Sequence, residues 1–135
     1  MNQVLLDTSA YLAYLRGNQE IKDILSSSET IYFNAVVLGE IYRGFRRGHR
    51  LKENEKEFNE FITSSRVKFI ELDEETSERY AVIANGLQDK GTPISANDVW
   101  ISASAMQYGL AVVTLDRDFL RVPQILAICP EAPAA

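Results

Sequence analysis

The chain has 135 residues, of which 46% are apolar and 24% are charged, and its formal net charge is −5 at pH 7. This length predicts a single domain with one core, and the apolar content is too high for a disordered chain. The negative charge argues against a general polyanion-binding protein, although a metal ion or a local basic strip is enough for phosphate binding. The single Cys129 excludes an internal disulfide and suits a cytoplasmic setting. No signal peptide or membrane span is recognisable, so we expect no membrane attachment.

Short apolar runs alternate with helical patterns along the chain. Strands are predicted at 4–6, 31–33, 67–70, 111–115 and 125–128. Helices are predicted at 9–16, 19–26, 35–48, 51–64, 73–90 and 95–109, followed by a loose tail over 130–135. Polar residues suited to capping mark the start of three of the helices, namely Asn18, Asn34 and Ser95, and Asp73 opens a fourth. This alternation predicts an α/β fold, with a mostly parallel sheet of four to five strands and helices on both faces.

Four acidic residues occupy positions that such a sheet brings together. Asp7 follows the first predicted strand and Asp116 the fourth, so both belong at the carboxyl edge, where α/β proteins bind ligands. Glu40 interrupts an apolar helical stretch, and Asp98 lies in the first turn of an apolar helix. Clustered carboxylates repel one another, and a divalent cation that prefers oxygen ligands, Mg²⁺ or Mn²⁺, relieves this repulsion. The pattern predicts a metal-dependent enzyme that acts on phosphate esters.

Each of these acids also has a purely structural interpretation. Asp7 is able to cap the helix that follows it, as well as to bind a metal. Glu40 is either a paired core acid or a ligand, and stabilisation of a helix dipole is sufficient to explain Asp98. Asp116 suits a turn. The position of each residue favours the ligand interpretation without excluding the alternative.

Four segments resemble the motifs of the PIN domain, in the order and at the spacing of that family. They are Leu5-Leu6-Asp7-Thr8-Ser9, Val37-Leu38-Gly39-Glu40-Ile41, Asn97-Asp98-Val99-Trp100-Ile101-Ser102-Ala103 and Thr114-Leu115-Asp116-Arg117-Asp118-Phe119. The resemblance runs from residue 3 to about residue 120 and implies one PIN-like three-layer sandwich over residues 1–135. The short length resembles the VapC toxins of toxin–antitoxin pairs, whose activity is metal-dependent endoribonucleolytic cleavage.

The resemblance carries over to individual positions. It implies that the catalytic and metal-binding residues are Asp7, Glu40, Asp98 and Asp116, with Mg²⁺ as the cofactor and Mn²⁺ as a substitute. It also implies supporting roles for Thr8, Ser9, Asn97, Thr114 and Asp118. Thr8 or Ser9 would hydrogen-bond Asp7. Three residues before Glu40, where the family has a Thr, this chain has Val37 and no hydroxyl.

The resemblance further implies an RNA substrate, a cognate VapB-like antitoxin and a homodimer. Apolar and aromatic residues of the first helices are the expected groove for the antitoxin, namely Tyr11, Tyr14, Leu15, Ile41, Tyr42 and Phe45. A basic strip that begins one turn after Glu40 suits RNA phosphates, although a solvated helix face explains it equally well; its arginines are Arg43, Arg46, Arg47 and Arg50.

Two other classes of protein compete with the nuclease interpretation. A PIN-like RNA- or protein-binding module without catalysis would share the fold, but the full acidic set argues against it. A signalling receiver domain also has an acidic Mg²⁺ pocket on a small α/β fold. It needs an acidic pair after the first strand and a Lys after the fifth, whereas here Asp7 is followed by Thr8 and Ser9 and no Lys follows Lys90.

Overall fold

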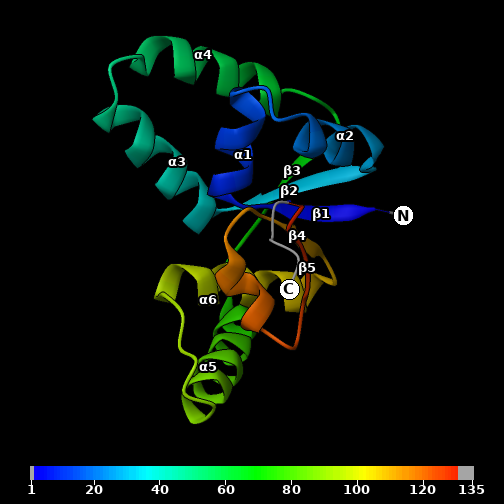
Figure 1. The fold of residues 1–135 in the computed structure, drawn as a ribbon, viewed down its shortest axis with the longest axis vertical. Helices are drawn as coiled ribbons and strands as arrows, with labels where there is room; N and C mark the ends of the chain where they lie inside the picture. Colours follow the sequence, from blue (N-terminus) through cyan, green and yellow to red (C-terminus); the bar gives the residue numbers. More distant parts are fainter. Residues whose placement is uncertain (1, 131–135) are drawn as a thin grey trace.

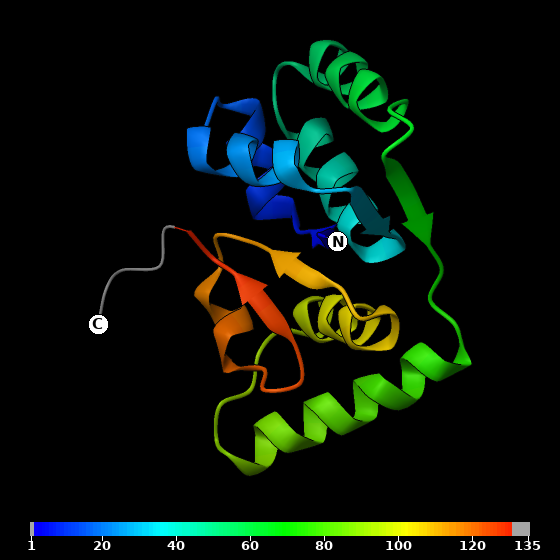
Figure 2. The same cartoon turned by 90° about the vertical axis from the view of Figure 1, so that its right-hand side faces the viewer.

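The computed structural model describes residues 2–130, in which a five-stranded parallel sheet lies between two layers of helices (Figures 1 and 2). The strands are β1 (Gln3–Leu6), β2 (Thr30–Asn34), β3 (Val67–Ile70), β4 (Ala111–Val113) and β5 (Leu126–Ile128). The helices are α1 (Thr8–Leu15), α2 (Gln19–Ser27), α3 (Ala35–Arg47), α4 (Leu51–Ile62), α5 (Glu74–Asp89), α6 (Ala96–Tyr108) and the 3₁₀-helix η1 (Arg117–Arg121). The predicted α/β three-layer sandwich is confirmed.

The strand order places the reversal of the sheet next to its first strand. The order is β3-β2-β1-β4-β5, and every neighbouring pair is parallel. The chain therefore extends the sheet in one direction from β1 to β3 and then returns to the other side of β1 with β4. Ligands of open α/β sheets bind at such a reversal, outside the carboxyl ends of the strands. A receiver domain has the order 2-1-3-4-5 instead, so the sheet excludes that alternative.

Two apolar cores hold the layers together. Helices α1 to α4 cover one face of the sheet and α5, α6 and η1 cover the other (Figure 1). The larger core joins the sheet to α1–α4 and includes an aromatic cluster in which Tyr11, Phe33 and Phe58 meet edge to face, with ring centroids 5.1 to 6.3 Å apart. The smaller core packs α5 against α6 through Ile83, Leu87 and neighbouring residues. Parallel sheets are buried on both faces, which agrees with the continuous apolar runs of the strands.

The predicted element boundaries agree with the structure to within about two residues because most of the signals are local. The side chain of Asn34 accepts a hydrogen bond from the Val37 N–H at 3.0 Å, and Asp73 forms a capping box with Thr76. Strand β4 is two residues shorter than predicted. Its shortening has a clear cause, since the N–H of Leu115 leaves the sheet and donates to Ser9 Oγ at 3.0 Å.

Two further predictions concern the whole chain. Within residues 2–130, no helix combines the length and the apolar character that crossing a bilayer requires. The predicted tail lies outside the described residues except for Pro130, which is in a turn.

Candidate active site

The four predicted acids approach one another at the carboxyl edge of the sheet. Asp7 directly follows β1, and Asp116 lies three residues after the end of β4. Asp98 is in the first turn of α6, and Glu40 lies in the second turn of α3. These residues converge at the reversal of strand order between β1 and β4, as predicted. Their carboxyl groups are close enough for their charges to interact.

Asp7 is buried and held by hydroxyl groups. Its Oδ2 accepts hydrogen bonds from Ser9 Oγ at 2.9 Å and from Thr114 Oγ1 at 2.7 Å. Burial raises the pKa of Asp7, the bonds from Thr114 and Ser9 act in the opposite direction, and the charge of Glu40 adds to the increase. Its side chain makes no capping hydrogen bond to α1. Asp7 thus occupies the N-cap position of α1 without a side-chain capping bond, and the hydroxyls of Ser9 and Thr114 hold its Oδ2.

The segment after β4 is tied to the same network. Thr114 Oγ1, which donates to Asp7, also accepts the N–H of Asp116 at 2.9 Å. Asp116 Oδ1 accepts the N–H of Asp118 at 2.9 Å at the start of η1. Asp116 thus forms a turn, as its structural interpretation predicted. One of its oxygens takes part in that turn.

Glu40 is held by two neutral donors from different elements. Thr8 Oγ1 donates to Glu40 Oε1 at 2.7 Å, and Asn97 Nδ2 donates to Glu40 Oε2 at 3.1 Å. The expectation that Thr8 or Ser9 would support Asp7 holds for the side chain of Ser9 only. The hydroxyl that is absent at Val37 is therefore supplied by Thr8, from the start of α1. No local pattern signals this contact, because Thr8 and Glu40 are separated by 32 residues.

Asp98 is a buried acid whose pKa is strongly perturbed. Burial and the nearby charges of Asp116 and Asp7 raise the pKa of Asp98 to about 7, against a weaker opposing hydrogen bond from Ser95. A buried carboxyl surrounded by other carboxyls is a marker of functional sites. Dipole stabilisation at the start of α6 does not by itself account for such an environment.

Three carboxylates form the tightest group among the described residues. Asp98, Asp116 and Asp118 each offer an oxygen, and these atoms lie within 4.8 Å of one another. Asp118 was predicted only as a supporting residue, whereas Asp7 and Glu40 lie outside this tightest group. Arg121 Nη1 lies 3.4 Å from Asp118 Oδ1. An all-oxygen donor set with surplus negative charge fits a hard divalent cation such as Mg²⁺ or Mn²⁺.

The predicted basic strip divides into two parts, along α3 and the loop between α3 and α4. Arg43 and Arg47 line a hollow of about 490 Å³ that also reaches Thr8, Glu40 and Asn97. We call it the α3 hollow. Arg46 and Arg50 do not line it, and Arg50 Nε contacts Glu53 Oε2 at 2.6 Å.

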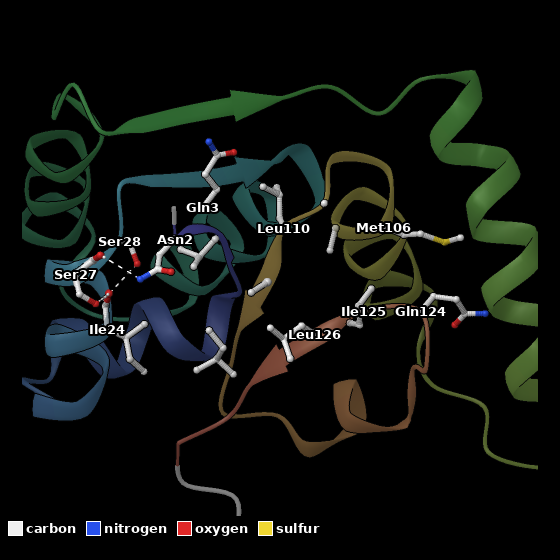
Figure 3. A pocket seen from close by; sticks show the side chains of 15 residues that line it. Asn2, Gln3, Ile24, Ser27, Ser28, Met106, Leu110, Gln124, Ile125 and Leu126 are labelled. Carbon is white, nitrogen blue, oxygen red and sulfur yellow. Dashed lines mark hydrogen bonds between the residues drawn. The ribbon is translucent and has the colours of Figure 1, made fainter.

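A second cavity of similar size, about 500 Å³, lies at the opposite edge of the sheet (Figure 3). It is bordered by the amino ends of β1, β4 and β5, where Gln3 and Leu126 are found, and by the carboxyl ends of α2 and α6. Among the described residues, none that lines it is charged. It therefore has no part in the acidic site.

Sequence similarity to known proteins agrees with the geometry of the site. The profile of the PIN domain matches residues 4–125. Ribonuclease VapC from Rickettsia bellii is 29% identical over 128 residues, which cover 90% of this chain and 92% of that protein. Ribonuclease VapC4 from Mycobacterium tuberculosis is 26% identical over 95 residues, which cover 70% of this chain and 73% of that protein.

Solved structures show the same fold. The crystal structure of DNA-bound VapBC from Salmonella typhimurium matches with a TM-score of 0.80 and 26% identity, over 95% of this chain and 98% of that chain. VapBC2 from Rickettsia felis, bound to a DNA fragment from its promoter, matches with a TM-score of 0.81 and 22% identity, over 93% of this chain and 97% of that chain. At that identity, the second likeness concerns the fold alone.

Proposed function

Because the chain belongs to the PIN domain family, we propose that it is a metal-dependent endoribonuclease and the toxin of a toxin–antitoxin pair. The observation that carries this proposal is the acidic cluster at the reversal of the sheet, where the pKa of Asp98 rises to about 7. A binding module without catalysis has no need to hold several carboxylates together against their repulsion. The ribonuclease names of the sequence relatives support the same proposal.

The proposed reaction is the hydrolysis of an RNA phosphodiester. Water adds to phosphorus, the bond to the 3′ oxygen breaks, and that oxygen takes up a proton. Mg²⁺ or Mn²⁺ would acidify the attacking water and neutralise the charge on the phosphate. Asp98 and Asp116, together with Asp7 and Asp118, would supply the oxygen ligands. Glu40 would orient the attacking water, since its carboxylate is held in place by Thr8 and Asn97.

A prediction follows from the support that Glu40 receives. Replacing Thr8 with Val keeps the shape of the side chain but removes the hydroxyl that donates to Glu40 Oε1. Loss of a supporting contact of this kind typically lowers metal affinity or activity by about 10- to 100-fold. We expect a loss in this range in metal-dependent RNA cleavage for Thr8→Val. Thr8→Ser, which keeps the hydroxyl, should restore most of the activity, and equal activities of the two variants would show that the hydrogen bond has no role.

We also propose a VapB-like antitoxin and a second copy of this chain as partners. Support comes from the VapBC complexes among the structural neighbours. A net-negative protein with a concentrated acidic site should attract a peptide that carries an Arg side chain. The groove predicted for this peptide needs revision. Tyr11, Ile41 and Phe45 are at most 2% exposed and belong to the core of the chain itself.

Three of the six predicted groove residues remain accessible. Tyr14 and Leu15 of α1 are partly buried, and Tyr42 of α3 is 38% exposed. All six were predicted as groove residues because the sequence does not distinguish an apolar helix face that is exposed from one that packs in the core. The structure shows that the opposing sheet and α4 already cover half of them.

Expression in cells tests the proposed function. Expression of the chain alone should slow growth, and co-expression with the product of an adjacent gene for a small DNA-binding protein should restore it. The purified protein should cleave RNA with Mg²⁺ or Mn²⁺ and lose this activity in EDTA. A harmless chain that leaves RNA intact with either metal would show that the proposal is wrong.

A further inference from the structure

The α3 hollow follows one face of a helix outward from the acidic site. The residues of α3 that line it recur at helical spacing, namely Ala35, Val36, Gly39, Glu40, Arg43, Gly44 and Arg47. The opposite face of the helix, with Val37, Ile41 and Phe45, is buried against the core. The hollow is thus a solvent-facing extension of the site. Glu40 belongs to both, since it lines the hollow and its charge acts on Asp7 and Asp98.

No acid of residues 2–130 forms an ion pair with either arginine of the hollow. Within residues 2–130, neither Arg43 nor Arg47 makes an ion pair or a side-chain hydrogen bond, so both are available to a ligand. Arg46 is also without such a contact in this part of the chain, and what distinguishes Arg43 and Arg47 from it is that they line the hollow. Four residues of α-helix separate Arg43 from Arg47, an axial rise of roughly 6 Å. The two guanidinium groups therefore present consecutive positive charges along a line that starts beside Glu40.

Two glycines line the hollow at positions where the protein itself does not require a glycine. Gly39 and Gly44 lie in the interior of α3, where a Gly lowers helix stability by about 1 kcal/mol relative to Ala. Neither has a positive φ, and a Cβ added to either would meet no atom within 4 Å. An alanine would therefore fit the protein without strain. Glycine in such a place suits the close approach of another molecule's backbone.

We propose that the α3 hollow is the track for the RNA strand that flanks the scissile bond. Arg43 and Arg47 contact neighbouring phosphates of the strand, and Gly39 and Gly44 leave room for its ribose–phosphate backbone. Arg46 and Arg50 lie outside the track. This inference rests on the proposed endoribonuclease function and adds to it the path of the substrate. An RNA strand suits the hollow better than an acidic peptide, because its charges repeat regularly along its backbone.

The charge of the track is tested by paired double variants. Arg43→Ala/Arg47→Ala removes both charges from the hollow, and Arg46→Ala/Lys56→Ala removes two exposed charges from α3 and α4 outside it. Binding of a short, labelled single-stranded RNA is measured in EDTA, so that the RNA stays intact. We expect the first variant to bind about tenfold more weakly. Its plot of log affinity against log salt should flatten by about 1.4, or 0.7 for each phosphate contact. The control should keep the wild-type slope.

The glycines allow a test in which stability and activity change in opposite directions. Gly44→Ala should raise the melting temperature by roughly 3 °C, because Ala favours the helix. Gly86→Ala in α5, where an added Cβ also meets nothing within 4 Å, should raise it similarly. Only the change at Gly44 should weaken RNA binding and cleavage. Gly44→Leu, which keeps good helix propensity and fills more of the hollow, should lower both by about tenfold.

The outcomes separate this inference from the proposed function. If the wild type cleaves RNA and the hollow variants bind and cleave like it, the track is wrong while the function stands. If the wild type leaves RNA intact with Mg²⁺ and Mn²⁺, the function fails, and the binding measurements in EDTA still decide the track. Variants that keep RNA affinity but lose binding of the antitoxin would show a protein-binding site and overturn the inference.

Discussion

An Asp7→Asn variant is expected to lose at least about 100-fold of its RNA cleavage while keeping its fold. Asp7 Oδ2 accepts hydrogen bonds from Ser9 and Thr114, and the carbonyl oxygen of an Asn is able to accept both. The second oxygen is then replaced by an NH₂ group, which neither binds a cation nor carries charge. Changes in the support of metal ligands already cost about 10- to 100-fold, so loss of a ligand should cost more.

Two measurements make this result decisive. Circular dichroism and thermal melting in EDTA should show an Asp7→Asn variant at least as stable as the wild type, since the substitution removes a buried charge. RNA cleavage is then compared at saturating Mg²⁺ and Mn²⁺. Activity close to that of the wild type would remove Asp7 from the proposed site. A variant without activity but with an intact fold would assign the loss to the carboxylate itself.

Divalent cations are expected to stabilise the wild type strongly. A ligand at about 100 times its Kd adds roughly 2.7 kcal/mol to the free energy of unfolding. For a chain of 135 residues, this corresponds to a rise in melting temperature of about 8 to 10 °C. Thermal melts in EDTA, Mg²⁺ and Mn²⁺ measure the effect. Equal melting temperatures at saturating metal would contradict a metal site in the cluster.

The stabilisation by metal should depend on pH in a defined direction. The pKa of Asp98 is raised from 3.8 to about 7 in the folded, metal-free protein, so between these values the folded state binds more protons than the unfolded state. The contribution of Asp98 to the stability of the metal-free protein therefore falls as pH rises from about 4 to about 7 and then levels off. Because a cation binds the ionised carboxylates, its stabilising effect should be larger at pH 8 than at pH 6.

Replacement of Asp98 with Asn supplies the control for this dependence. Asn has nearly the same shape but does not ionise, so the variant should be more stable than the wild type in EDTA at pH 8. Its melting temperature should also respond much less to Mg²⁺ or Mn²⁺. If Asp98→Asn kept the full metal response, Asp98 would have no part in binding the cation.

The sequence by itself determined the elements of the fold and the identity of the acidic residues. Caps such as Asn34 and Ser95 were predictable because the bonds that they make join residues three apart. The apolar runs identified all five strands, and Asp7 and Asp116 followed from their positions after two of them. These signals are local, since hydrogen bonding within a turn and burial along a strand depend on neighbouring residues.

Only the tertiary structure decided which groups contact one another around the acids. Thr8 donates a hydrogen bond to Glu40, and Ser9 donates one to Asp7. The carboxylate of Asp118 lies close to those of Asp98 and Asp116. The order of the strands sets these partners, because β4 returns to the side of β1 and brings Thr114 to Asp7 across 107 residues. The same packing buries half of the predicted antitoxin groove and divides the basic strip between the α3 hollow and open solvent. A helix shows its period in the sequence, but which of its faces meets a neighbouring element depends on the packing of the whole chain.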